Sequence, residues 1–265
     1  MATAVLPDCE LHYEQRGSGP PLLLIAGIPA VASDWRPVAE RMAAGGRRAI
    51  AYDNRGSGAS TVTPGPYTTA GLAADAVALL DFLEIERADV FGMSLGGMIA
   101  QELAIGWPER VERLALCCTH AGGRHAPRQP RATAHAFAME TEDWAERMTA
   151  LAPFAFARGV DPALLARFIA KKRADAQDPE GYRAQIAAAL GHDAADRLGE
   201  IRAPTLIVTG DDDQVIPAVG SEVLVARIPR AKLATIEGTG HLFFLEEPDR
   251  THQVVAGFLS RTAVA

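Results

Sequence analysis

The sequence Gly92-Met93-Ser94-Leu95-Gly96-Gly97 follows the pattern G-x-S-x-G and separates an apolar run, Ala88–Phe91, from a segment with helical periodicity. A turn directly between a strand and a helix forces its central residue into a cramped backbone conformation, which flanking glycines relieve because they carry no Cβ. The following helix directs its N-terminal N–H groups at the same point, where they stabilise negative charge. The pattern therefore predicts an exposed, reactive Ser94 hydroxyl, with an ordinary glycine-rich turn as the alternative interpretation.

Outward from this turn, short apolar runs alternate with segments of helical spacing. Several runs lack polar alternation, which is typical of parallel strands covered on both faces. Helical spacing is visible over Thr69–Glu84 and over Ile99–Trp107, where Pro108 ends the pattern. This alternation predicts an α/β fold with a mostly parallel central sheet flanked by helices. The expected strands are Leu22–Ala26, Arg48–Tyr52, Ala88–Phe91, Val111–Cys117, Thr205–Thr209 and Lys232–Ile236.

The alternation lapses between Thr119 and Ala203, where only amphipathic pieces occur, over 133–151, 162–177 and 179–190. This region is either a separate small domain or a helical insertion. Strand–helix alternation resumes at Pro204, which favours an insertion into an unfinished sheet. We therefore expect a core formed by residues 1–118 and 204–265, with residues 119–203 as a helical cap, or lid.

Composition excludes several classes of protein. The chain has 265 residues, of which 48% are hydrophobic and 22% charged, as in ordinary globular domains. A net charge of −7 argues against binding to nucleic acid or to an anionic membrane surface. Three cysteines, two of them adjacent, do not form a secreted disulfide framework. The start of the chain lacks a basic region followed by a long apolar stretch, so we expect a cytoplasmic protein.

A serine hydroxyl needs a base, and the base needs an acid to fix its tautomer. Of the seven histidines, His241 alone lies in a short glycine loop directly after an expected strand, where α/β sheets build their sites. His120 follows the run that ends at Cys117 and is a candidate for the pocket wall. Candidates for the acid are three adjacent carboxylates among which the residues themselves do not choose: Asp211, Asp212 and Asp213.

The order serine, acid, histidine is that of the α/β-hydrolase fold family, which the chain resembles over nearly its whole length. Beside the Ser94 turn, three segments carry the resemblance. Gly210–Pro217 is similar to the family's G-x-x-D-x-hydrophobic-hydrophobic-P, Gly240–Pro248 to its G-H-x-x-x-x-E-x-P, and Tyr52–Ser60 to its D-x-R-G-x-G-x-S turn. The spacing of the segment Gly210–Pro217 selects Asp213 as the acid. In the last, Asp53 and Arg55 are expected to be structural, with the arginine bonded to carbonyls of the site loops.

The resemblance implies a serine hydrolase with Ser94 as nucleophile, His241 as base and Asp213 as its acid. The backbone N–H groups of Ile28 and Leu95 would form the oxyanion hole. One segment departs from the family pattern, because Ala26 stands where a histidine often orients the first oxyanion loop. We expect this replacement to affect the stability of the loop more than the catalytic activity.

The chain is most similar to small esterases and lactonases such as 3-oxoadipate enol-lactonase and polyketide methylesterases, which implies an ester or lactone of a small to medium, partly apolar molecule. The expected partner is this substrate alone, with no metal and no organic cofactor. The sequence does not indicate an oligomeric state. The alternatives are cofactor-free peroxidase or dioxygenase chemistry or C–C bond hydrolysis on the same fold, and a small-molecule sensor that retains the triad. Candidates for the pocket wall are His120, Phe137, Trp144 and Met148.

Overall fold

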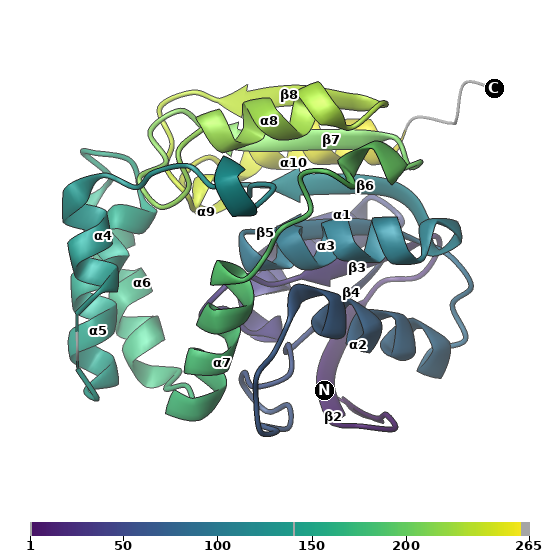
Figure 1. Cartoon of the computed structure of the whole chain (residues 1–265), viewed down its shortest axis with the longest axis horizontal. Coiled ribbons are helices and arrows are strands. Elements are labelled where there is room, and N and C mark those ends of the chain that lie inside the picture. The colour runs from purple at the N-terminus through teal and green to yellow at the C-terminus, as the bar shows by residue number, and fades with distance from the viewer. Residues whose placement is uncertain (1, 140, 261–265) are drawn as a thin grey trace.

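The computed structural model describes residues 2–139 and 141–260, and these form an eight-stranded sheet flanked by helices (Figure 1). The strand order is β1-β2-β4-β3-β5-β6-β7-β8. Among the described strands, the pairs β1–β2 and β2–β4 are antiparallel and all other pairs are parallel, so the sheet is mostly parallel. The strands are β1 (Ala2–Val5), β2 (Glu10–Arg16), β3 (Pro21–Ile25), β4 (Arg48–Tyr52), β5 (Ala88–Met93), β6 (Val111–Cys117), β7 (Thr205–Gly210) and β8 (Ala231–Ile236).

Apolar residues of the parallel strands are buried on both faces of the sheet. In β3, Leu23 and Ile25 pack into a cluster with α2 (Thr69–Phe82) and α3 (Leu95–Gly106). Leu22 and Leu24 point the other way, toward α1 (Arg36–Ala44) and α10 (Pro248–Leu259). Figure 1 shows α2 and α3 in front of the sheet and α1 behind it. The α/β fold and the six expected strands are thereby confirmed, and the unbroken apolar runs follow from burial on both faces.

The two N-terminal strands are additional to the six strands expected from the apolar runs. β1 and β2 form an antiparallel hairpin at the edge of the sheet, and β2 also pairs with β4. In β2 the buried Leu11 and Tyr13 alternate with the more exposed Glu10 and His12, whereas Glu14 is buried and bonded to Arg36. A half-buried edge strand carries fewer apolar residues than a central one, so its signal in the sequence is weaker.

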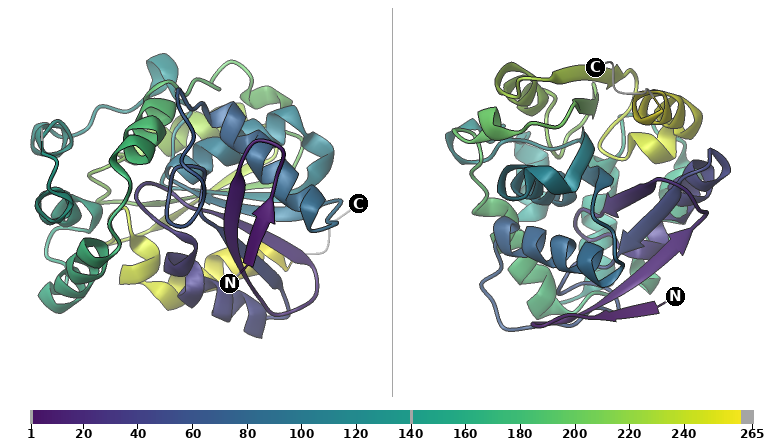
Figure 2. Two further views of the ribbon diagram at one scale, coloured as in Figure 1. Left: turned by 90° about the horizontal axis from the view of Figure 1, so that it is seen from below. Right: turned by 90° about the vertical axis from the view of Figure 1, so that its right-hand side faces the viewer.

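Between β6 and β7 the chain leaves the sheet and forms four α-helices that lie together at the left of Figures 1 and 2 (left view). They are α4 (Arg131–Phe137), α5 (Trp144–Leu151), α6 (Pro162–Ala174) and α7 (Pro179–Leu190). The expectation of one amphipathic piece over 133–151 is wrong, because it is divided into α4 and α5. Asp143 begins α5 by accepting the N–H groups of Ala145 and Glu146 on its side chain.

The remaining elements are short, except for one helix after β7. They are α8 (Val219–Arg227), α9 (Phe243–Glu246) and the 3-10 turns Ala32–Trp35, Pro108–Arg110, Gly123–His125, Ala152–Ala155 and Leu198–Glu200. No helix among the described residues has the length and apolarity that crossing a bilayer requires.

Candidate active site

Ser94 lies at a tight junction between β5 and α3. Its backbone has a φ of 55° and a ψ of −119°, a conformation that residues with a side chain rarely adopt. A Cβ on Gly92 would lie 2.3 Å from the carbonyl oxygen of Gly96, and a Cβ on Gly96 would lie 2.0 Å from that of Ile25. Both glycines therefore exclude any side chain, for the steric reason that the pattern indicated.

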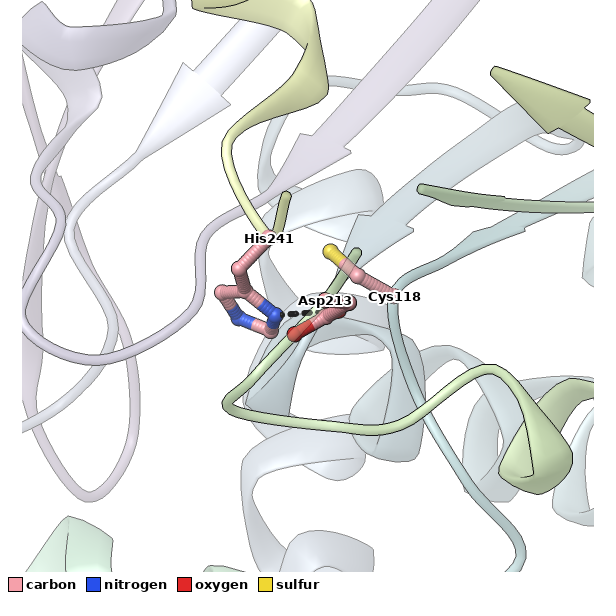
Figure 3. A group of neighbouring side chains, drawn as sticks. All are labelled: Cys118, Asp213 and His241. Atoms are coloured by element: carbon pink, nitrogen blue, oxygen red, sulfur yellow. Dashed lines mark hydrogen bonds and ion pairs between the residues drawn. The ribbon is translucent and has the colours of Figure 1, made fainter. Parts of the chain in front are cut away.

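The imidazole of His241 lies beside the carboxylate of Asp213 (Figure 3). His241 Nδ1 is 2.8 Å from Asp213 Oδ2. An ionised carboxylate only accepts hydrogen bonds, so Nδ1 carries the proton and Nε2 keeps its lone pair. The other oxygen, Oδ1, accepts the N–H groups of Val215 and Ile216 at 2.8 Å each. The carboxylate is thus fixed by the backbone, and it fixes the ring in turn.

The three adjacent carboxylates have different partners. Asp211 Oδ1 accepts the N–H of Gly238 at 2.6 Å, and Asp212 Oδ2 accepts the N–H of Arg158 at 2.6 Å. Both bonds hold loops together. Only Asp213 is bonded to the imidazole, so the structure separates side chains that their own positions in the sequence did not distinguish.

The charge of the imidazole is set by two opposed effects. Burial alone lowers the pKa of His241, because the charged ring loses its hydration. The adjacent carboxylate of Asp213, with a smaller contribution from Cys118, acts in the opposite direction and prevails, so the pKa of His241 is raised well above its ordinary value. The pair therefore stabilises a proton on the ring, as a base that must hold a proton briefly requires.

Cys118 contributes a third side chain to this group (Figure 3), and its Sγ lies within 4.8 Å of ligand atoms of Asp213 and His241. These distances would suit a metal ion. However, Nδ1 and Oδ2 are already bonded to each other, and burial raises the pKa of the Cys118 thiol to about 11. A protonated thiol is a poor metal ligand, so the donor set does not favour a metal.

Ser94 and His241 line the same cavity, whose volume is about 1480 Å³. The loop after β3 closes over the serine, since a Cβ on Gly27 would lie 2.8 Å from Ser94 Cβ and 3.4 Å from its Oγ. In the described part of the chain, no hydrogen bond joins the hydroxyl of Ser94 to the imidazole. Such bonds are often long in unliganded enzymes and tighten when substrate binds.

The two N–H groups expected in the oxyanion hole border this cavity. Ile28 and Leu95 both line it, and neither backbone N–H donates to another described residue. The loop that carries Ile28 is supported from β4, because Asn54 Nδ2 donates to the carbonyl of Ala26 at 2.9 Å. A side-chain amide on the neighbouring strand end thus holds the loop in which Ala26 replaces the usual histidine.

The Asp53–Arg55 turn is structural, but not in the way the sequence indicated. Asp53 accepts the N–H groups of Ala32 and Ala59 and so ties the loop after β3 to its own turn. The expectation that Arg55 bonds carbonyls of the site loops is wrong. Its guanidinium forms an ion pair with Asp75 of α2, with Nε 2.9 Å from Oδ2. A guanidinium stabilises a buried carboxylate more than it stabilises a neutral carbonyl, and this explains why Arg55 pairs with Asp75.

The four candidate pocket residues all line the cavity. Phe137, Trp144 and Met148 come from α4 and α5 and also pack with one another in a small apolar cluster. Trp144 is further held by a hydrogen bond from Nε1 to the carbonyl of Lys172, at 2.6 Å. His120 comes instead from the end of β6, on the sheet side. The apolar side chains therefore serve both as a local core and as cavity wall.

One polar contact at the cavity was not anticipated. Lys172 of α6 is buried, and its Nζ lies 2.5 Å from Asp34 Oδ2 and 3.2 Å from the carbonyl of Pro29. Lys171 Nζ reaches the other oxygen, Asp34 Oδ1, at 2.8 Å. The signal was present in the sequence, because Lys172 follows Phe168 by four residues and so shares its apolar helix face. A lysine on such a face needs a buried partner.

The chain is similar to known proteins over nearly its whole length. The model of the family described as alpha/beta hydrolase fold matches residues 20–248. A protein of Azorhizobium caulinodans, named provisionally as the carbamate hydrolase RutD, is 32% identical over 95% of both chains. One of Mycobacterium tuberculosis, named provisionally as a non-heme bromoperoxidase, is 31% identical over 94% of this chain and 97% of its own. The enol-lactonase structure from Burkholderia xenovorans superposes with a TM-score of 0.86 at 27% identity, covering 98% of this chain and all of its own.

Proposed function

The chain belongs to the α/β-hydrolase fold family and is a hydrolase, and from this premise we propose that it cleaves a carboxylic ester or lactone through an acyl-enzyme on Ser94. One observation carries the proposal. The strained turn of Ser94 and the His241–Asp213 pair open on a single cavity. A hydroxyl, a base with a free lone pair and an oriented carboxylate are the groups that nucleophilic acyl transfer requires.

In the first half-reaction, Ser94 Oγ attacks the carbonyl carbon of the substrate and its proton passes to His241 Nε2. The negative charge that develops on the carbonyl oxygen is received by the N–H groups of Ile28 and Leu95. As the tetrahedral intermediate collapses, the bond to the leaving oxygen breaks, and that oxygen takes the proton from His241. For a lactone the leaving oxygen stays attached to the acyl group as its new hydroxyl.

In the second half-reaction, water attacks the acyl-enzyme and gives its proton to His241 Nε2. The ester bond to Ser94 then breaks, the proton returns to Oγ, and the carboxylic acid leaves. Asp213 keeps the ring in the tautomer that accepts through Nε2 in both steps, and its charge stabilises the imidazolium. Proton and charge are thus restored after each turnover, and no cofactor is consumed.

The cavity supports the proposed substrate class. A volume of about 1480 Å³ admits a small to medium molecule, and the side chains of Phe137, Trp144 and Met148 provide apolar walls. Relatives named for lactone or carbamate hydrolysis support a substrate with a carbonyl group. We expect the substrate to be the only partner that the reaction needs. The cytoplasmic location stays a prediction.

We further propose that residues 119–203 act as a cap over a core of residues 1–118 and 204–265. Helices α4–α7 fall inside this range, and side chains from each of them line the cavity. Substrate would therefore enter between the helices and the sheet. Exchange of residues in these helices should change which esters are cleaved without abolishing the reaction.

The proposal is tested with the Ser94→Ala variant on short-chain p-nitrophenyl esters and on aliphatic and aromatic lactones. We expect kcat to fall by about 10⁴- to 10⁶-fold. Ser33→Ala is the matched control, because Ser33 lines the same cavity and loses the same hydroxyl. A fluorophosphonate should add one adduct mass at Ser94. Full activity of Ser94→Ala, or labelling at another residue, would refute the assignment.

The second candidate is cofactor-free peroxidase chemistry, which the relative from Mycobacterium tuberculosis favours by its name. Turnover that requires halide and peroxide, in the absence of esterase activity, would identify it. C–C bond hydrolysis would appear as cleavage of a carbon–carbon substrate by the same three side chains. A sensor would instead show ligand-dependent binding to a partner that persists in Ser94→Ala.

A further inference from the structure

A second histidine faces the cavity with the opposite arrangement of its ring nitrogens. His120 follows β6, and the backbone N–H of Gly122 donates to its Nδ1 at 2.9 Å. A backbone N–H can only donate, so Nδ1 must be an acceptor and carry no proton. In the neutral ring the proton then sits on Nε2. His241 presents a lone pair at Nε2, whereas His120 presents an N–H.

The ring of His120 stays neutral at ordinary pH. Burial, and secondarily the nearby His192, lowers the pKa of His120 to about 4. Its backbone is held as well, since Gln101 Nε2 donates to the carbonyl of His120 at 3.1 Å. On the opposite side α8 approaches closely, and a Cβ on Gly220 would lie 3.0 Å from His120 Cβ. The ring is therefore fixed in both tautomer and position.

The N–H of Nε2 has no partner within the described residues. This nitrogen is not sealed inside the protein, because the buried side-chain atoms that lack a hydrogen-bond partner do not include it. Since His120 lines the cavity, we infer that this unpartnered nitrogen meets the space where substrate binds. A single oriented donor beside apolar walls selects for a ligand that carries an acceptor at the matching point.

We propose that His120 Nε2–H donates a hydrogen bond to a substrate oxygen other than the reacting carbonyl, so that the enzyme favours acyl groups carrying a keto or ether oxygen. This inference rests on the proposed function and names the substrate class more closely. His120 forms and breaks no covalent bond in the reaction. It cannot replace His241 as base, because its one lone pair is occupied by Gly122.

Two substitutions separate the donor from the structural contact. His120→Asn retains an acceptor near the position of Nδ1 for the Gly122 N–H but removes the donor at Nε2. His120→Gln does the reverse, because its amide nitrogen reaches about as far as Nε2 and its amide leaves the Nδ1 position empty. Ser94→Ala run alongside reports on the nucleophile, so failure of this inference and failure of the proposed function are distinguishable.

The probes are p-nitrophenyl hexanoate and its 3-oxo, 4-oxo and 5-oxo derivatives, each assayed with wild type and both variants. Comparing the ratio of kcat/KM between an oxo ester and the plain ester across enzymes cancels the intrinsic reactivity of each substrate. We expect this ratio, for at least one oxo position, to fall about 10-fold in His120→Asn. In His120→Gln it should stay within a few-fold of wild type, and the kcat/KM of each enzyme on plain hexanoate is the reference for its own ratio.

A ratio that is equal in wild type and His120→Asn at every oxo position would overturn the inference. The inference would also be overturned if His120→Asn kept the full ratio of kcat/KM and His120→Gln lost it. In that case the contact of Nδ1 with the Gly122 N–H, and not the donor at Nε2, would determine the preference. If Ser94→Ala also keeps its activity, the proposed function has failed as well. If Ser94→Ala is inactive, the error is confined to His120.

Discussion

The cavity has two sides that are built in different ways. Its floor, the loops after β3, β5, β7 and β8, carries Ile28, Ser94, Asp213 and His241, and backbone groups or buried polar side chains fix these loops. Its roof, helices α4–α7, has a small apolar cluster of its own and reaches the floor through side chains such as the Asp34–Lys172 pair. We therefore expect substitutions in the floor to abolish the reaction. Substitutions in the roof should instead change which substrates are bound.

The most damaging test of the floor is Asp213→Asn. An amide can offer its NH₂ to the ring and so favour the wrong tautomer of His241, and it provides no charge for the imidazolium. We expect kcat to fall by about 10⁴-fold in the p-nitrophenyl ester assay. Asp212→Asn is the matched control, because its carboxylate bonds Arg158 and not the ring. An equal fall in kcat in the two variants would show that the orientation of His241 by Asp213 does not govern the reaction.

The floor also predicts an asymmetry between two glycines of α3. A Cβ on Gly96 would lie 2.0 Å from the carbonyl oxygen of Ile25, a backbone atom that cannot move aside. We expect Gly96→Ala to lower the free energy of unfolding by about 3 kcal/mol. Gly106, at the end of the same helix, has nothing within 4 Å of such a Cβ, and Gly106→Ala should be neutral or stabilising by about 0.5 kcal/mol. Urea unfolding of both variants measures the difference.

The floor sets the pH dependence as well. The base must be unprotonated to act, and the Asp213 carboxylate raises the pKa of His241 above its ordinary 6.5. Activity should therefore be present above that raised pKa and be lost as the pH falls through it, with kcat/KM decreasing about tenfold per pH unit. The pH profile of kcat/KM checks this. A limb centred at or below 6.5 would mean that burial outweighs the carboxylate.

The floor was largely predictable from the sequence, and the roof was not. Ser94, Asp213 and His241 are far apart in the chain, but each lies in a short motif whose spacing the backbone geometry demands. Gly92 and Gly96 illustrate this, because no other residue fits. In the roof, apolar spacing indicated helices but not the break between α4 and α5. The partner of Lys172 lies 138 residues away, and no local pattern encodes such a pair.

The smallest effect is expected in the roof, at the Asp34–Lys172 pair, because Asp34 is also paired with the ammonium of Lys171. Asp34→Asn leaves the buried ammonium of Lys172 with neutral oxygens only and no carboxylate, whereas removing Lys172 leaves Asp34 still paired with Lys171. We therefore expect Lys172→Met, which keeps the apolar stem against Phe168, to cost about 1 kcal/mol, and Asp34→Asn to cost about 3 kcal/mol.

Both variants should raise KM a few-fold and leave the response of the enzyme to fluorophosphonate intact, because neither Asp34 nor Lys172 contacts Ser94, Asp213 or His241 through a hydrogen bond. Lys171→Met is the matched control, since its ammonium is more exposed and its loss leaves the buried pair in place. Thermal unfolding and ester kinetics of the three variants give the comparison. A large fall in kcat for Lys172→Met would contradict the division drawn between the two sides, because the roof would then govern the chemistry as well as the binding.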